Sequence, residues 1–317
     1  MKKRWLKMLP VLLLLAVLTI VSAAGASAES LDLERKVTLT VNPGPSSEEM
    51  KDLSNADVQV DLYKIADAEA DFEHGSTYTF SVLEGVTLSK NIGTYEDLLA
   101  LTNEDWQTLS QDAAKSVLLD GSAVRETPAL TAAASLKGEG MTADLESGLY
   151  LVIARDATLT TKQYVLTEDG KVTTIANSNE YVYTWAPELI ALPTTVKEMG
   201  TDGERGDVST AGGDWKYDVK ATLKPTQDVR FGDLDIVKNL VNYDNATPAT
   251  FVFSVVATLR GEKVYDDVVS LTFTSAGSET YELIEKLPVG EYTLREVTAP
   301  DKNYMRLASE WESVSPS

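Results

Sequence analysis

The chain has 317 residues, enough for about two domains of the usual ~100–200 residues, and its 43% hydrophobic residues can form ordinary globular cores. It carries 28 basic and 49 acidic side chains, a formal net charge of −21, so its surface repels nucleic acid and anionic lipid. It has no cysteine and one histidine, and it contains no phosphate-binding glycine loop, dinucleotide fingerprint or nucleophile elbow. We therefore expect no disulfide, zinc site, cofactor or enzymatic activity.

The first 28 residues have the three parts of a secretory signal peptide. A basic start is followed by an apolar run from Leu9 to Val21, and Ala26-Ser27-Ala28 has the small-x-small pattern of a cleavage site. The run is shorter than the ~20 apolar residues of a membrane span. We predict cleavage after Ala28 and a secreted protein. No apolar segment of spanning length follows, so no membrane anchor is expected in this sequence.

From residue 33 onward, apolar and polar residues mostly alternate, which is the period of half-buried β-strands. Turn-forming segments such as 42–45 and 168–170 separate the alternating stretches. The predicted fold class is therefore mainly β, with Ig-like sandwiches in tandem. The alternating apolar positions are Val37, Leu39 and Val41; Val58, Val60 and Leu62; Leu149, Leu151 and Ile153; Tyr217, Val219, Ala221 and Leu223; Phe251, Phe253, Val255, Ala257 and Leu259; Leu271 and Phe273; Tyr292 and Leu294.

One region has helical spacing instead. Between Tyr95 and Leu119, apolar residues recur every three or four positions, and Thr94 or Thr102 can cap the N-terminus. We predict one or two short helices inserted into the first β-domain.

Two domains follow the signal peptide in this interpretation. Residues 29–229 form the first β-domain, in which 197–214 is a long loop and 215–223 is the last strand. Residues 230–317 form the second, a small β-sandwich that is incomplete at its last strand.

Two charged residues have the core-facing phase of their predicted strands. Lys238 shares the phase of the apolar residues around it in 234–240, and Glu296 shares that of Tyr292 and Leu294. Because side chains alternate with a period of two, neither residue can change face without a bulge.

Two interpretations of this charged pair remain open. Both side chains can lie at strand ends and extend to water. Alternatively they form a buried pair, because a buried Lys or Glu without a partner is costly. Burial can keep a lysine amine neutral and nucleophilic and a carboxyl protonated. Such a lysine could attack the side-chain carbonyl of a nearby Asn or Asp and form an amide cross-link between the first and last strands.

At these residues the second domain resembles a known family. Residues 287–300 (LPVGEYTLREVTAP), followed by Tyr304, look like the E-box of Cna-B-type and related pilin isopeptide domains. Residues 233–240 look like the lysine-bearing first strand of that family, and 250–259 like its second strand.

The resemblance implies an Ig-like sandwich in which Lys238 is the cross-linking amine and Glu296 is the autocatalytic carboxyl. In the family, the bonding Asn lies on a final strand after the E-box. Here the sequence ends at Ser317 and Asn303 comes too early for that strand, so the cross-link partner is not visible. A cell-wall sorting signal is also missing, since 192–195 (LPTT) lacks the glycine and the segments that follow it. We therefore expect a truncated gene product or a gene fragment.

The first domain resembles the N-terminal domain of Gram-positive pilin subunits of the SpaA-like family. The match is spread over residues 60–67 (VDLYKIAD), 148–152 (GLYLV) and 186–193 (APELIALP). That family ends this domain with a pilin motif, a Trp-x-x-x-Val strand leading to a lysine used by sortase. Residues 215–225 (WKYDVKATLKP) fit this outline and place Lys224 as the sortase lysine, although Thr-Leu stands where the family has Tyr-Pro.

The resemblance implies a structural cell-surface protein, a pilin-like or adhesin subunit on the cell wall of a Gram-positive bacterium. Its implied partners are sortase and other pilin subunits. The alternative is a secreted β-sandwich module that binds a glycan or a host matrix protein without pilus assembly, because surface sandwiches carry binding sites on their loops. Trp106, Trp185 and Trp215 are the candidates for a sugar-binding face in that case.

Overall fold

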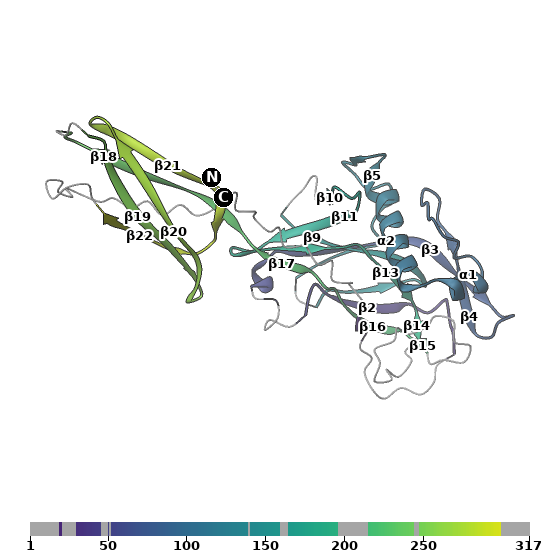
Figure 1. Ribbon diagram of the computed structural model, residues 1–317. Coiled ribbons are helices and arrows are strands. Elements are labelled where there is room, and N and C mark those ends of the chain that lie inside the picture. The colour runs from purple at the N-terminus through teal and green to yellow at the C-terminus, as the bar shows by residue number, and fades with distance from the viewer. Residues whose placement is uncertain are drawn as a thin grey trace. The chain divides into compact units, whose positions relative to one another are not determined.

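A computed structural model describes residues 19–20, 30–45, 50, 52–138, 140–158, 164–195, 215–243 and 247–298 (Figure 1). The chain divides into two compact units. Unit 1 comprises Met1–Ser178 and Val182–Gln227, and unit 2 comprises Asn179–Tyr181 and Asp228–Ser317. Most described residues lie in strands, so the predicted mainly-β fold class is confirmed.

Two sheets of unit 1 contribute many of its buried residues. One has the strand order β1-β16-β2-β8, and the other has the order β13-β9-β3-β4, with β7 also paired to β3. Their bounds are β1 (Thr19–Ile20), β16 (Asp218–Thr222), β2 (Val37–Asn42) and β8 (Thr142–Leu145), and β13 (Glu188–Leu192), β9 (Gly148–Asp156), β3 (Val58–Asp71), β4 (Thr77–Val82) and β7 (Ala134–Lys137).

These strands show how local sequence sets burial. Val37, Leu39 and Val41 of β2 are buried while the residues between them are not, as the alternation predicts. Strand β9 differs, because nearly all of Gly148–Asp156 is buried on both faces. It pairs with β3 and β13, and helix α2 (Asn103–Leu118) contacts it as well. The expectation of a half-buried strand was therefore wrong for this segment.

Other strands of unit 1 form further sheets. Strands β10 (Tyr164–Leu166), β11 (Val172–Asn177) and β12 (Tyr181–Trp185) form one antiparallel sheet. The remaining pairs are β14 (Thr194–Thr195) with β15 (Trp215–Lys216), and β5 (Leu119–Asp120) with β6 (Ala123–Val124). Strand β17 (Thr226–Val229) contains the division between the two units, and η1 (Leu53–Asn55) is a short 3₁₀ turn.

The sequence predicted one or two short helices in the first β-domain, and the described residues contain two. Helix α1 spans Tyr95–Ala100 and α2 spans Asn103–Leu118, and Figure 1 shows both within unit 1. Both candidate caps are used. The Thr94 hydroxyl accepts a hydrogen bond from the backbone of Asp97, and Thr102 forms a reciprocal capping box with Asp105.

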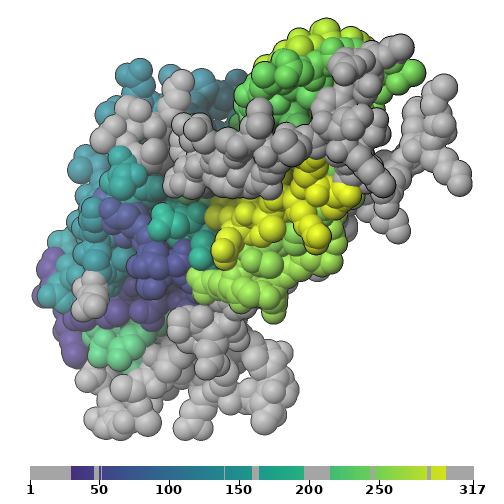
Figure 2. All heavy atoms as spheres, turned by 90° about the vertical axis from the view of Figure 1, so that its left-hand side faces the viewer, coloured from purple at the N-terminus to yellow at the C-terminus, as the bar shows by residue number. Residues whose placement is uncertain are grey.

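Unit 2 is a sandwich of two sheets, β18-β21 and β20-β19-β22. Buried residues from both sheets form one core, which includes Ile236, Phe251, Phe273 and Leu283. In Figure 2 the residues of unit 2 near the end of the described chain are coloured yellow. The bounds are β18 (Phe231–Leu240), β19 (Ala249–Leu259), β20 (Glu262–Phe273), β21 (Gly277–Pro288) and β22 (Glu291–Thr298).

Some expectations fall outside these ranges. Apart from β1, which pairs with β16, the predicted signal peptide and its cleavage site lie outside the described residues, as do the loop 197–214, Asn303 and Tyr304. In the part of the chain that the structure describes, no helix has the length and apolarity needed to cross a membrane.

Candidate functional site

Lys238 and Glu296 both face the interior of unit 2. In β18, Ile236 and Leu240 are buried, and the Lys238 side chain, with the same phase, is 20% exposed. In β22, Tyr292 and Leu294 pack against the core, and the Glu296 side chain is 26% exposed. The backbone period thus turns both charged side chains inward, where the loss of water makes a partner necessary.

The structure brings these two residues together. Lys238 Nζ donates a hydrogen bond to Glu296 Oε2 at 2.9 Å. Because β18 and β22 belong to different sheets, this ion pair joins the two layers of the sandwich. The interpretation of two side chains that extend separately to water therefore does not describe this pair.

An aromatic surface lies beside the lysine. Lys238 Nζ is 4.4 Å from the ring centroid of Phe251 and 5.9 Å from that of Phe253, both on β19. Phe253 is also the β19 residue directly opposite Glu296 in the strand register. Lys238 is thus held between a carboxylate and two aromatic rings, a setting that restricts water and fixes the position of Nζ. The sequence alternation of β19 predicted two buried rings, but not their place beside this lysine.

A second carboxylate lies near Lys238 in the register. Glu279 of β21 is directly opposite Lys238, but it is an exposed residue, whereas Glu296 is partly buried. The two glutamates therefore differ in their access to water, and Glu279 serves as a natural control for the role of Glu296.

The third residue predicted for a site, Lys224, lies elsewhere. It is a half-buried residue of unit 1, in the segment between β16 and β17, whereas Lys238 and Glu296 belong to unit 2.

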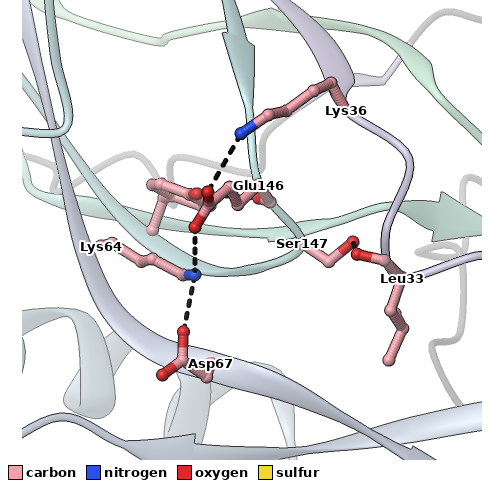
Figure 3. Close-up of polar contacts among 7 residues, drawn as sticks. Leu33, Lys36, Lys64, Asp67, Glu146 and Ser147 are labelled. Atoms are coloured by element: carbon pink, nitrogen blue, oxygen red, sulfur yellow. Dashed lines mark hydrogen bonds and ion pairs between the residues drawn. The ribbon is translucent and has the colours of Figure 1, made fainter.

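A charged cluster in unit 1 was not predicted from the sequence. Figure 3 shows Glu146 between two lysines, with its carboxylate 3.0 Å from Lys36 Nζ and 3.4 Å from Lys64 Nζ. Lys64 also pairs with Asp67 at 2.6 Å, and a depression of about 400 Å³ lies beside the cluster. The lysines also hold the pKa of Glu146 below its ordinary value, through the Lys36 hydrogen bond first. Two positive and two negative groups satisfy one another here, which favours a structural role over ligand binding.

A hydrogen bond next to this cluster supports that role. The Ser147 hydroxyl donates to the backbone carbonyl of Leu33 at 3.0 Å, just before β2 (Figure 3). The cluster and this bond together fasten the segment that precedes β2 to the β8–β9 corner. Lys36 and Glu146 are 110 residues apart, so no local pattern could predict their contact.

A buried ion pair was also missed. Arg155 Nε donates to Asp61 Oδ2 at 2.5 Å, and the two side chains are 14% and 4% exposed. The other carboxylate oxygen of Asp61 accepts from Ser135 Oγ at 2.6 Å and from Gln59 Nε2 at 2.9 Å. The carboxylate is well satisfied, so we assign the pair to the structure of unit 1. The sequence signal for this pair was an acidic residue, Asp61, within an otherwise apolar strand segment.

Two of the three tryptophans proposed for a sugar-binding face are buried. Trp185 and Trp215 are each 1% exposed, and their indole N–H groups donate to the backbone carbonyls of Pro43 and Ser76. They are core residues, which removes two of the three tryptophans on which that interpretation was based. Among the described residues, no group of three His, Cys, Asp or Glu side chains could hold a metal ion.

Comparisons with known proteins leave the family open. No family model and no curated protein matches the chain. The chain is similar to GBS52, the minor pilin of the Gram-positive pathogen Streptococcus agalactiae, at 13% identity over 85% of this chain and 86% of that one, with a TM-score of 0.17. It is similar to the major pilin protein T3.2 of Streptococcus pyogenes serotype GAS13637 at 10% identity over 84% and 83%, with a TM-score of 0.18. TM-scores this low carry no argument about fold or function.

Proposed function

We propose that this chain is a structural, pilin-like or adhesin subunit of a Gram-positive cell surface, and that Lys238 forms an isopeptide cross-link within unit 2. The observation that carries the proposal is the 2.9 Å contact between Lys238 and Glu296 across the two sheets. The E-box-like stretch 287–300 supports it, since it contains Glu296 in the matching position.

The proposed reaction needs a neutral amine. Over the 2.9 Å hydrogen bond, the Lys238 ammonium can pass one proton to Glu296, which leaves an amine and a carboxylic acid. The amine attacks the side-chain carbonyl carbon of an Asn, a C–N bond forms, and the bond to the original amide nitrogen breaks. Glu296 returns its proton to the departing nitrogen, which leaves as ammonia. The attacking nitrogen loses its second proton to the Glu296 carboxylate, once Glu296 has given up the first one. With an Asp partner, the leaving group is water.

The surroundings of the pair favour this chemistry. Phe251 and Phe253 limit the access of water to Nζ, which lies 4.4 and 5.9 Å from their ring centroids. The Phe251 ring also restricts the positions that Nζ can take, because Nζ lies over it. Arginine at position 238 could not replace the lysine, since a guanidinium does not lose its proton in proteins.

The cross-link would serve a mechanical function. A covalent bond from β18 restricts the unfolded chain as a disulfide does, and it needs no cysteine, of which this chain has none. In the same proposal unit 1 is a pilin N-terminal-type domain and unit 2 a Cna-B-type domain. Lys224 is the lysine that sortase joins to another pilin subunit on the cell wall.

The intact mass of the secreted full-length gene product tests the cross-link. We expect a mass below that of the mature sequence by one ammonia or one water, and tandem mass spectrometry of a digest identifies the residue bonded to Lys238. Glu296→Ala should restore the full sequence mass.

Glu279→Gln is the matched control, because it removes the exposed carboxylate opposite Lys238 and should keep the mass loss. A wild-type mass equal to the sequence mass would exclude the cross-link. Loss of the cross-link in Glu279→Gln but not in Glu296→Ala would show that the wrong glutamate has been assigned.

A further inference from the structure

The only histidine of the chain joins two elements of unit 1. His74 lies in the turn between β3 and β4, and its ring stacks on Tyr95, the first residue of α1, with centroids 4.5 Å apart and planes inclined by 13°. In Figure 1, α1 lies beside the β3–β4 hairpin. The side chain is 36% exposed and has partners on both sides.

Each ring nitrogen faces a carboxylate. Nδ1 is 2.8 Å from Asp71 Oδ2 in the turn, and Nε2 is 3.3 Å from Glu96 Oε1 in α1. The other Asp71 oxygen accepts the backbone N–H groups of Glu73 and His74, at 3.0 and 3.2 Å, so the turn positions Asp71 itself.

This geometry depends on the protonation state of the ring. An imidazolium has two N–H groups and can donate to both carboxylates, whereas a neutral imidazole has one N–H and one lone pair. After loss of a proton, one ring nitrogen therefore presents a lone pair to a carboxylate oxygen. The contact to Asp71 is shorter and lies within the turn, so the contact to Glu96 is the one that is lost.

We propose that His74 is a pH-dependent tether between the β3–β4 turn and α1, closed while the ring carries both protons and open after it loses one. The turn also carries Phe72, which is 83% exposed, so opening frees the segment that presents this aromatic side chain. The tether needs only residues of unit 1 and is independent of the Lys238 cross-link.

The charged groups around His74 set the pH at which the tether opens. Asp71 and Glu73 face it from the turn and Glu96 faces it from α1, and all three are acidic. The Asp71 hydrogen bond, opposed in part by loss of water, raises the pKa of His74 above its usual 6.5. The tether is therefore closed below pH 6.5 and opens as the pH rises through the higher value in the folded protein.

Nuclear magnetic resonance of the imidazole tests the proposal directly. The full mature chain without a polyhistidine tag has one histidine, so its ring signals need no assignment. We expect a titration midpoint above 6.5 in the wild type and a lower midpoint in Glu96→Gln. Glu104→Gln is the matched control, since Glu104 is the second residue of α2 as Glu96 is of α1, and it should leave the midpoint unchanged.

Hydrogen exchange measures the opening. After correction for intrinsic rates, amides of residues 72–77 should lose protection on the order of two- to fivefold as the pH passes the midpoint. The step should be absent in His74→Gln and reduced in Glu96→Gln. A wild-type midpoint at or below 6.5, a midpoint unchanged in Glu96→Gln, or an equal step in His74→Gln would each overturn the tether.

Discussion

Replacement of Arg155 by methionine is predicted to destabilise unit 1 strongly. Methionine keeps much of the side-chain length but removes the donor to Asp61 Oδ2. The Asp61 carboxylate would remain at 4% exposure with hydrogen bonds only on its other oxygen, from Ser135 and Gln59. A buried charge that loses its ionic partner is far more costly than a surface charge, because water cannot reach it.

The magnitude follows from this burial. Breaking a buried ion pair from one side costs about 3–5 kcal/mol. A unit of this size loses about 2–4 °C of Tm per kcal/mol, so Arg155→Met should lower the Tm of unit 1 by roughly 6–20 °C. The double variant Asp61→Leu with Arg155→Met removes both charges and should recover most of this loss, since a well-packed apolar pair is often equally stable.

Differential scanning calorimetry of the mature chain can measure this effect. Lys137→Met is the control, since it breaks the Lys137–Asp57 pair, at 3.1 Å but with side chains 55% and 46% exposed. An exposed pair of this kind contributes about 0–1 kcal/mol. If Arg155→Met shifts the Tm no more than Lys137→Met, or if the double variant is less stable than Arg155→Met, the reasoning about burial is wrong.

Two further predictions concern packing and a helix cap. Gly148→Ala should destabilise unit 1 by about 1–3 kcal/mol in urea unfolding, because the new Cβ would lie 2.5 Å from the Ala66 carbonyl oxygen. Gly170→Ala is the control. At Gly170 a Cβ meets nothing within 4 Å but φ is positive, so this variant shows the effect of backbone strain without crowding. Asp105 accepts from the Thr102 backbone and hydroxyl and pairs with Lys90, in that order of effect, which lowers its pKa to about 2. The stabilisation that the ionised Asp105 gives the folded protein is fully present above pH 3.8, the ordinary pKa of the group. It is lost as the pH falls through about 2. The Tm difference between wild type and Asp105→Ala should therefore be larger at pH 6 than at pH 2, and a constant difference would contradict the assignment.

The sequence predicted much of the candidate site because strand periodicity determines the face of each side chain. It turned Lys238 and Glu296 inward, but it left open whether they pair or extend separately to water. It could not show that β18 and β22 lie in different sheets, since sheet membership depends on contacts between distant segments. The position of Phe251 beside Lys238 was hidden for the same reason.

Other features have weaker local signals. Strand β9 carries Tyr150, Val152 and Ala154 between its predicted core positions, so its apolar run was continuous, which is typical of a strand buried on both faces. We interpreted the alternation of Leu149 and Leu151 as a strand buried on one face, and so did not predict burial on both faces. The Lys36–Glu146 contact offers no such signal, because any of the many acidic residues could meet a given lysine.

Two interior ion pairs with similar geometry have different chemical capacities. Arg155 and Asp61 form the more deeply buried pair, but a guanidinium keeps its proton, and three donors already satisfy the carboxylate. Lys238 and Glu296 lie 2.9 Å apart with side chains 20% and 26% exposed, and a lysine and a glutamate can exchange a proton. Burial and distance alone would rank Asp61 and Arg155 as the stronger candidates for a site. The ability of the cation to become a nucleophile reverses that order, and the proposal of a cross-link in unit 2 depends on it.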